Sequence, residues 1–160
     1  MSSALFDEIQ ELKARYPDPR SAVMPALHLA QSREGWLPPD ALREVADALD
    51  LTPAYVMSIA SFYDMYDLEP TGTHKIAVCT NVSCALAGAQ DVVDAFEREL
   101  GCAPGETTED GEFSLTTFEC LGGCGWATVV AVDWRYREHV GASDVPGIVA
   151  ELKGEAGDGA

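Results

Sequence analysis

The sequence has few basic side chains and no long apolar run. Of its 160 residues, 10 are lysine or arginine and 27 are aspartate or glutamate, which gives a net charge of −17 at pH 7. This charge repels phosphate backbones, so nucleic acid is not expected as a partner. No apolar stretch approaches the roughly 18 residues that a transmembrane helix needs, so we expect no direct insertion into a membrane.

The sequence also lacks two recognisable signals. Its first segment, MSSALFDEIQELKARYPDPR, has no apolar core of a secretory signal peptide. This absence favours a cytosolic chain, in which thiols stay reduced and disulfides are rare. Neither a GxGxxG nor a Walker-type loop occurs, so nothing predicts that this chain binds NAD or a nucleotide by itself.

Four of the five cysteines form two close pairs. Cys79 and Cys84 have the spacing C-x4-C, and after a gap of 35 residues Cys120 and Cys124 have the spacing C-x3-C. The pairs could hold an iron–sulfur cluster or a zinc ion, or they could be disulfides or redox thiols. An odd number of cysteines fits a disulfide framework poorly, and neither pair has the C-x-x-C of a thioredoxin-type redox site. Cys102 lies outside the pattern and is expected to be a small buried hydrophobe.

The spacing and the neighbouring residues favour iron and sulfur over zinc. Four intervening residues are wide for a zinc knuckle, whereas C-x4-C also occurs in plant-type ferredoxins, and each pair can bind one iron of a [2Fe–2S] cluster. Gly122, Gly123 and Gly125 flank the second pair. Without Cβ atoms they let backbone N–H groups approach cluster sulfurs. Structural zinc and redox thiols remain alternatives on these residues alone.

The first 70 residues have the apolar spacing of α-helices. One helix is expected to run from about Leu5 to Tyr16, and a second from Ser21 to Gln31, ended by Gly35. A third opens at Pro38-Pro39-Asp40 and carries an apolar stripe as far as Leu49. Thr52-Pro53 has the form of an N-cap followed by proline at the first helical position, so a fourth helix should follow.

The third and fourth of these helices also resemble a helix-turn-helix, in the segment DALREVADALDLTPAYVMSIASFY. With a cluster beside it, such a module would suggest a redox-sensing DNA-binding protein. Between Asp40 and Asp67, however, Arg43 is the only basic residue. A recognition helix without lysine or arginine has no contact to offer to phosphates or guanines, so this hypothesis is disfavoured.

After the linker Thr71-Gly72-Thr73 the period changes, and the order β-α-β-β-β-α is expected. Each cysteine pair follows a predicted strand and is expected in a loop at that strand's end, so two adjacent strand ends would bring the pairs together. This order predicts an α/β layer architecture similar to thioredoxin. The expected elements are strands 75–78, 113–119, 128–132 and 136–140, a helix over 92–100, a helix ending near 152, and a disordered tail.

Four segments make the sequence resemble the E-type subunit of bacterial NADH-quinone oxidoreductase, the thioredoxin-like [2Fe–2S] subunit family of respiratory complex I. Both cysteine spacings and the gap between them match the ligand pattern of that family. The resemblance covers nearly the whole chain apart from its first residues and its tail. The segments are RSAVMPALHLAQSREGWLPPDAL from Arg20, ASFYDMYDLEPTG from Ala60, VCTNVSCALAGA from Val78 and ECLGGCGWA from Glu119.

The resemblance implies an α+β (α/β-like) fold, with an N-terminal helical bundle followed by a thioredoxin-like [2Fe–2S] ferredoxin domain. The expected boundaries are residues 1–70 for the helical region, 74–153 for the cluster domain and 154–160 for a disordered tail. It also implies one [2Fe–2S] cluster per chain, with Cys79 and Cys84 binding one iron and Cys120 and Cys124 the other. No residue is expected to act as an acid, base or nucleophile.

The implied role is electron transfer in the NADH-oxidising module of complex I. The chain would exchange single electrons with FMN held by a partner flavoprotein subunit, which also binds NADH. The implied location is the cytoplasm, peripheral on the cytoplasmic side of the inner membrane through the complex. An alternative is the equivalent diaphorase subunit of an NAD-linked hydrogenase or formate dehydrogenase.

The sequence departs from this family at one position near the last cysteine. The family usually has C-x-x-A-P there, whereas this chain has Cys124-Gly125-Trp126-Ala127-Thr128. Proline fixes φ and removes an N–H donor, and threonine restores that donor. The departure is expected to affect the reduction potential of the cluster more than its presence.

Overall fold

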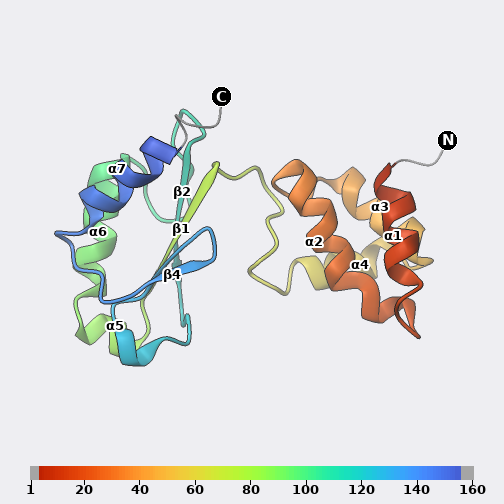
Figure 1. The fold of residues 1–160 in the computed structure, drawn as a ribbon, viewed down its shortest axis with the longest axis horizontal. Coiled ribbons are helices and arrows are strands. Elements are labelled where there is room, and N and C mark those ends of the chain that lie inside the picture. Colours follow the sequence, from red (N-terminus) through yellow and green to blue (C-terminus); the bar gives the residue numbers. More distant parts are fainter. Residues whose placement is uncertain (1–3, 156–160) are drawn as a thin grey trace. The chain divides into compact units, whose positions relative to one another are not determined.

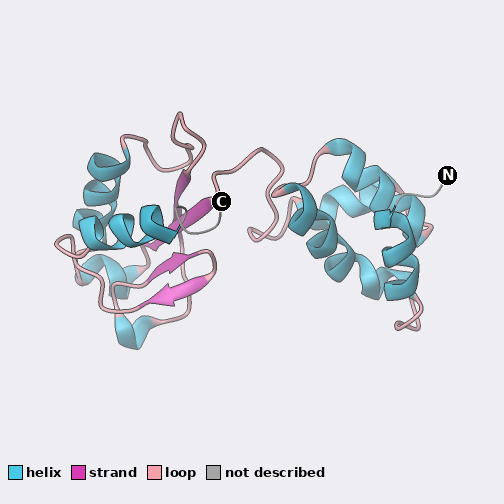
Figure 2. Ribbon diagram, turned by 45° about the horizontal axis from the view of Figure 1, so that its top comes forward, coloured by secondary structure: helices cyan, strands magenta, loops and turns pink. Residues whose placement is uncertain are grey.

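The computed structural model describes residues 4–155, and the chain forms two compact units that divide between Pro70 and Thr71 (Figure 1). The first unit is helical and the second contains a sheet (Figure 2). Each unit has its own apolar core.

The helical unit packs one apolar face of each helix into a single core. Leu27, Val45, Leu49 and Val56 are fully buried there, which agrees with the apolar stripes in the sequence. Tyr66 closes this core, and its hydroxyl donates to the carbonyl of Met24 at 2.8 Å. The elements are α1 (Ala4–Lys13), the 3-10 helix η1 (Pro19–Ala22), α2 (Val23–Glu34), α3 (Pro39–Leu49) and α4 (Pro53–Ala60).

Local capping sets most helix ends where the sequence predicts them. Gly35 ends α2 in the left-handed conformation at φ 76°, where a side chain would be strained. The Thr52 hydroxyl accepts from the amide of Tyr55 at 3.3 Å and caps α4, directly before Pro53. The expected extension of α1 to Tyr16 is wrong, because the amides of Arg15 and Tyr16 bond three residues back and the helix tightens and stops.

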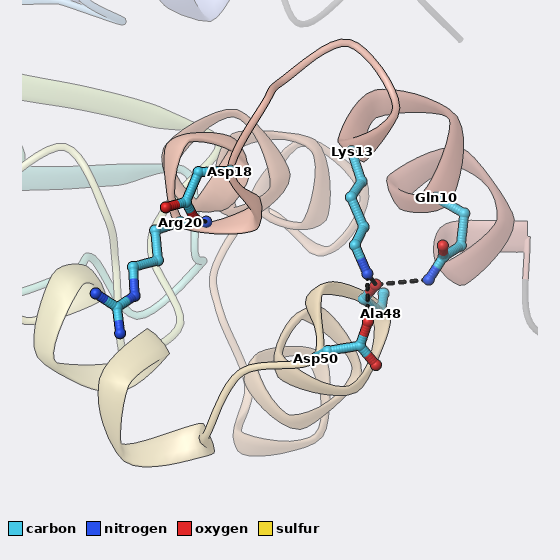
Figure 3. A network of polar contacts seen from close by, with 6 residues as sticks. All are labelled: Gln10, Lys13, Asp18, Arg20, Ala48 and Asp50. Atoms are coloured by element: carbon cyan, nitrogen blue, oxygen red, sulfur yellow. Dashed lines mark hydrogen bonds and ion pairs between the residues drawn. The ribbon is translucent and has the colours of Figure 1, made fainter.

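Two side chains of α1 satisfy the C-terminal end of α3, whose last carbonyls have no partner within their own helix. Gln10 Nε2 donates to the carbonyl oxygen of Ala48 at 2.5 Å, and Lys13 Nζ approaches the same oxygen at 3.4 Å (Figure 3). Lys13 also forms an ion pair with Asp50. A cation at this position additionally complements the negative end of the helix dipole.

The second unit is built on a mixed four-stranded sheet in the order β2-β1-β3-β4. Its strands are β1 (His74–Cys79), β2 (Phe113–Phe118), β3 (Val130–Val132) and β4 (Arg135–Arg137). β1 pairs with β2 in parallel, while β3 is antiparallel to both β1 and β4. The carboxyl ends of β1 and β2 therefore lie at the same edge of the sheet.

Alternate residues of the central strands face two separate apolar clusters. One cluster joins Ile76 and Val78 to α6 (Ala89–Leu100) and α7 (Val145–Glu155), which cover one side of the sheet (Figure 1). A second cluster forms around Ala77, Val129 and Ala131 and includes two of the paired cysteines. The period-2 pattern of a strand thus divides a general core from the surroundings of the thiols.

The expected α+β class and the order of the elements are confirmed, with the strand ends displaced by a few residues. The structure adds one α-helix that the sequence pattern did not predict, α5 (Val82–Leu86). The last helix continues past 152, so Gly154 and Glu155 are helical instead of part of a tail, and residues 156–160 lie outside the described residues. Among residues 4–155, no helix is both long and apolar enough to cross a bilayer.

Candidate metal centre

The parallel pairing of β1 and β2 brings the segments with the two cysteine pairs to one edge of the sheet. Cys79 is the last residue of β1, and its register partner is Phe118, the last residue of β2. The amide of Thr80 donates to the Phe118 carbonyl at 2.8 Å, so the two segments stay paired just beyond the strands. Cys120 follows two residues later.

The first pair is buried, and its two members lie in regular structure. Cys79 is 2% exposed in β1, and Cys84 is 1% exposed in α5. The expectation that this pair lies in a loop is therefore wrong. The turn between them begins α5 at Asn81 in extended conformation, and one short helical turn brings Cys84 back toward Cys79.

The second pair is exposed and follows β2 in a glycine-rich turn. Cys124 begins the 3-10 helix η2 (Cys124–Trp126). Gly122 has φ 77°, a conformation that favours glycine, and its amide donates to Cys120 Sγ at 3.3 Å. At Gly123 a Cβ would lie 2.8 Å from a methyl of Val129, so the absence of a side chain lets this turn pack against the second apolar cluster.

Backbone amides from three segments converge on the buried thiols. Burial acts to raise the pKa of Cys79, but the amides of Leu121 and Asn81 and the thiol of Cys84 bond to its sulfur and hold that pKa below its ordinary value. Leu121 follows Cys120 directly. A backbone N–H of the second pair's turn therefore contacts a sulfur of the first pair.

The pKa of Cys84 moves in the opposite direction to that of Cys79. Burial raises the pKa of Cys84 most strongly, against a bond from the Val129 amide, and the neighbouring Cys79 and Cys124 raise it further. The electrostatic interaction with Cys124 joins one member of each pair. The two pairs, 35 residues apart in sequence, thus lie within electrostatic range of each other.

The donor set fits a cluster with two thiolates for each iron. Sulfurs of three paired cysteines, Cys79, Cys84 and Cys120, accept backbone N–H bonds, and such bonds are what cluster thiolates receive in iron–sulfur proteins. Two thiolates for each iron is the ligand arrangement of a [2Fe–2S] cluster that is held by four cysteines.

Thr128 stands at the position where the sequence departs from the family pattern. The peptide bond between Ala127 and Thr128 is cis, and Thr128 is 1% exposed. Its carbonyl accepts from the Val140 amide at 3.0 Å, while its hydroxyl has no hydrogen-bond partner. A buried hydroxyl without a partner is destabilising. Thr128 thus places an unsatisfied donor directly before Val129, whose amide bonds Cys84.

The sequence pattern did not single out the amides of Leu121 and Val129 as donors, or the side chain of Tyr136. The Tyr136 hydroxyl donates to the Leu121 carbonyl at 2.5 Å, 15 residues away in sequence. The glycines around Cys120 signal close backbone approach, but no sequence signal links a tyrosine of β4 to this turn. Cys102 is buried in the α6–α7 cluster, where burial raises its pKa, and it lies outside both pairs.

Three comparisons place the chain among known proteins. The family model of the thioredoxin-like [2Fe-2S] ferredoxin matches residues 9–153. An E-type NADH-quinone oxidoreductase subunit of Rhizobium meliloti is 41% identical over 147 residues, covering 92% of this chain and 88% of that protein. NADH-quinone oxidoreductase subunit 2 of Thermus thermophilus is 41% identical over 150 residues, covering 92% and 83%.

A solved structure supports the fold at lower sequence identity. The structure of an NAD+-reducing [NiFe]-hydrogenase in its air-oxidized state superposes with a TM-score of 0.74 and 22% identity. The match covers 83% of this chain and 23% of the hydrogenase chain. From the match over 9–153 and the relatives at about 41% identity, the chain belongs to the thioredoxin-like [2Fe-2S] ferredoxin family.

Proposed function

We propose that this chain is the [2Fe–2S] electron-transfer subunit of the NADH-oxidising module of an NADH-quinone oxidoreductase. The observation that carries the proposal is the convergence of the two cysteine pairs at one sheet edge, with N–H donors on three of their sulfurs. The relatives at 41% identity, which are subunits of NADH-quinone oxidoreductases, support the parent complex.

We assign Cys79 and Cys84 to one iron, and Cys120 and Cys124 to the other. The assignment divides the site into a buried half and an exposed half. The buried half is held by β1 and α5 and is shielded by apolar neighbours such as Leu121 and Val129. The exposed half lies at the surface of its unit, where a redox partner has direct access to it. In the same assignment, residues 74–153 form the cluster domain and 1–70 a separate helical region.

A [2Fe–2S] cluster, when bound, takes up and releases one electron at a time. The chain's own residues supply ligation, burial and oriented N–H dipoles, and no side chain has to transfer a proton. Amides of Asn81, Leu121 and Val129 point at thiolate sulfurs and stabilise their negative charge. The protein therefore contributes position and potential, while hydride chemistry belongs to a partner.

The partner that we propose is the flavoprotein subunit that holds FMN and the NADH site. Because a flavin accepts two electrons and an iron–sulfur cluster one, a carrier of this kind suits a site next to a flavin. The chain would then lie on the cytoplasmic side of the inner membrane as a peripheral part of the complex. The relatives from Rhizobium meliloti and Thermus thermophilus are subunits of NADH-quinone oxidoreductases, which supports membership of such a complex.

A stopped-flow experiment tests this role. The chain is mixed with NADH in the presence or absence of the FMN-binding subunit that co-purifies with it, and the visible absorption of the cluster is followed. We expect rapid bleaching only with the flavoprotein present. Oxidation of NADH by the isolated chain would contradict the assignment of hydride chemistry to the partner.

The second candidate keeps the cluster and changes the complex. The hydrogenase, an enzyme that reduces NAD+, has the same fold over most of this chain. Its identity of 22% is about half that of the NADH-quinone oxidoreductase relatives. Affinity purification of the tagged chain from its native cells separates the two candidates. A hydrogenase or formate dehydrogenase catalytic subunit in the purified complex would favour the second.

A further inference from the structure

The hydroxyl of Tyr136 reaches a cysteine sulfur through one peptide group. It donates to the carbonyl oxygen of Leu121 at 2.5 Å. The peptide bond that starts at this carbonyl ends at the amide of Gly122, which donates to Cys120 Sγ at 3.3 Å. The hydroxyl, the Leu121–Gly122 peptide and the thiol therefore form a continuous hydrogen-bonded chain.

The orientation of a trans peptide makes this chain cooperative. Its C=O and N–H dipoles are parallel and point to opposite sides, so a donor on the oxygen polarises the N–H on the other side. Hydrogen bonds in such a chain strengthen one another by roughly 10–30% each. Gly122 has φ 77°, and no atom outside residues 121–123 lies within 4 Å of where its Cβ would be. Glycine thus lets the backbone turn its N–H toward the sulfur.

The sheet places Tyr136 on the same side as the apolar cluster that contains Cys79 and Cys84. Tyr136 pairs with Ala131 across β3 and β4, and Ala131 belongs to the apolar cluster that contains Cys79, Cys84 and Leu121. Directly opposed residues of paired strands face the same side of a sheet. The preceding turn is also fixed, since the Trp134 ring meets the Phe118 ring edge-on at a centroid distance of 5.8 Å.

We propose that Tyr136 is a positioning residue that tunes the reduction potential of the cluster through the Leu121–Gly122 peptide and Cys120. The inference rests on the proposed function, because it takes Cys120 as a ligand. A stronger N–H bond to a thiolate sulfur stabilises the reduced, more negative cluster and raises its potential. Loss of the Tyr136 hydroxyl should therefore lower the potential without removing a ligand.

The test compares Tyr136→Phe with a matched control in the other unit. The Tyr66 hydroxyl also donates to a backbone carbonyl, that of Met24 at 2.8 Å, in the helical core. Tyr66→Phe thus removes the same kind of bond in the unit that contains none of the five cysteines. Both variants and the wild-type chain are purified with their cluster, titrated electrochemically and examined by EPR and resonance Raman spectroscopy.

We expect Tyr136→Phe to keep its iron and to lower the ratio of reduced to oxidised cluster about threefold at a fixed potential, equal to about 30 mV for a one-electron couple. The EPR g values and the Fe–S(Cys) stretching bands should shift with it. Tyr66→Phe should leave all three readouts at wild-type values. Tyr136→Leu, which removes the ring as well, should reproduce the shift of Tyr136→Phe.

Three results would overturn the proposed relay, that is, the effect of the Tyr136 hydroxyl on Cys120 through the Leu121–Gly122 peptide. The first is a wild-type potential in Tyr136→Phe, and the second is an equal shift in Tyr66→Phe. The third is loss of the cluster from Tyr136→Phe or Tyr136→Leu, because Tyr136 would then hold the turn together instead of tuning it. A wild-type chain that binds no cluster would overturn the proposed function itself, and the relay with it. Failure of the relay alone leaves the wild-type cluster intact.

Discussion

The two units of the chain differ in what their polar groups do. In the helical unit, polar side chains such as Gln10 and Lys13 satisfy helix ends, and one apolar core joins all the helices. In the sheet unit, backbone amides of three segments turn toward thiols, and the apolar residues divide into two clusters. Polar groups thus complete the secondary structure of the first unit, whereas those of the second prepare a site for a negatively charged group.

Loss of a proposed buried ligand should distinguish the two units most strongly. Cys84→Ser removes a thiolate from a position in α5 that is 1% exposed. The serine hydroxyl that replaces it is a poorer ligand for iron than a thiolate. We expect loss of nearly all visible absorption of the cluster, with helical circular dichroism largely retained. The measurement is iron and sulfide content per chain.

Cys102→Ala is the matched control for that substitution. Cys102 is also a buried cysteine of the sheet unit, but it packs among α6 and α7 residues outside both pairs. We expect this variant to retain a wild-type cluster spectrum. Equal loss of iron from both variants would mean that general damage to the unit, and not ligation, explains the result.

Truncation in the helical core should produce the opposite pattern. Leu49 in α3 is fully buried, so Leu49→Ala should lower the free energy of unfolding of that unit by about 2–5 kcal/mol. The cluster spectrum should stay unchanged. Met57→Ala on α4, where the side chain is 44% exposed, should cost less than about 0.5 kcal/mol. Urea titration followed by far-UV circular dichroism gives both values.

Two glycines of the sheet unit should respond with opposite signs to the same substitution. A Cβ on Gly72 would lie 2.6 Å from the backbone carbonyl carbon of Phe113, so Gly72→Ala should destabilise by about 2 kcal/mol. Gly147 lies in α7 with open space around its Cβ position, so Gly147→Ala should stabilise by about 0.5–1 kcal/mol. Destabilisation by Gly147→Ala would show that the space around its Cβ position is not open, and an unchanged stability of Gly72→Ala would show that the linker before β1 is not closely packed.

A small gain in stability is expected at Thr128. Its buried hydroxyl has no partner, so Thr128→Val removes an unsatisfied group at nearly constant shape. We expect the metal-free chain to gain about 1 kcal/mol in thermal or urea unfolding. A loss of stability of similar size would show that the hydroxyl has a partner in solution. Thr128→Ser, which keeps the hydroxyl, should not show the gain.

Sequence periodicity predicted the architecture because apolar spacing records which face of an element is buried. The stripe ending at Leu49 and the apolar strand before Asp133 both appear in the structure. The five-residue helix α5 escaped prediction because so short a segment shows no period. The end of α1 was placed too late, since Tyr16 continues the apolar stripe while the backbone has already left the α-helix.

The cysteine pairs were visible in the sequence, but their surroundings were not. Spacing named four thiols and the strand ends that bring them together. It could not name Leu121 and Val129, because every residue except proline carries an N–H and only the fold decides where that N–H points. Tyr136 was missed for a similar reason. Its contact with Leu121 depends on the β3–β4 pairing.

The proposed role of the sheet unit requires the two cysteine pairs to bind one [2Fe–2S] cluster together. Metal analysis with EPR on the anaerobically purified chain is the decisive test. We predict about two irons and two acid-labile sulfides per chain, and one rhombic spin signal after reduction by one electron. A colourless chain with one zinc and no labile sulfide would contradict this assignment.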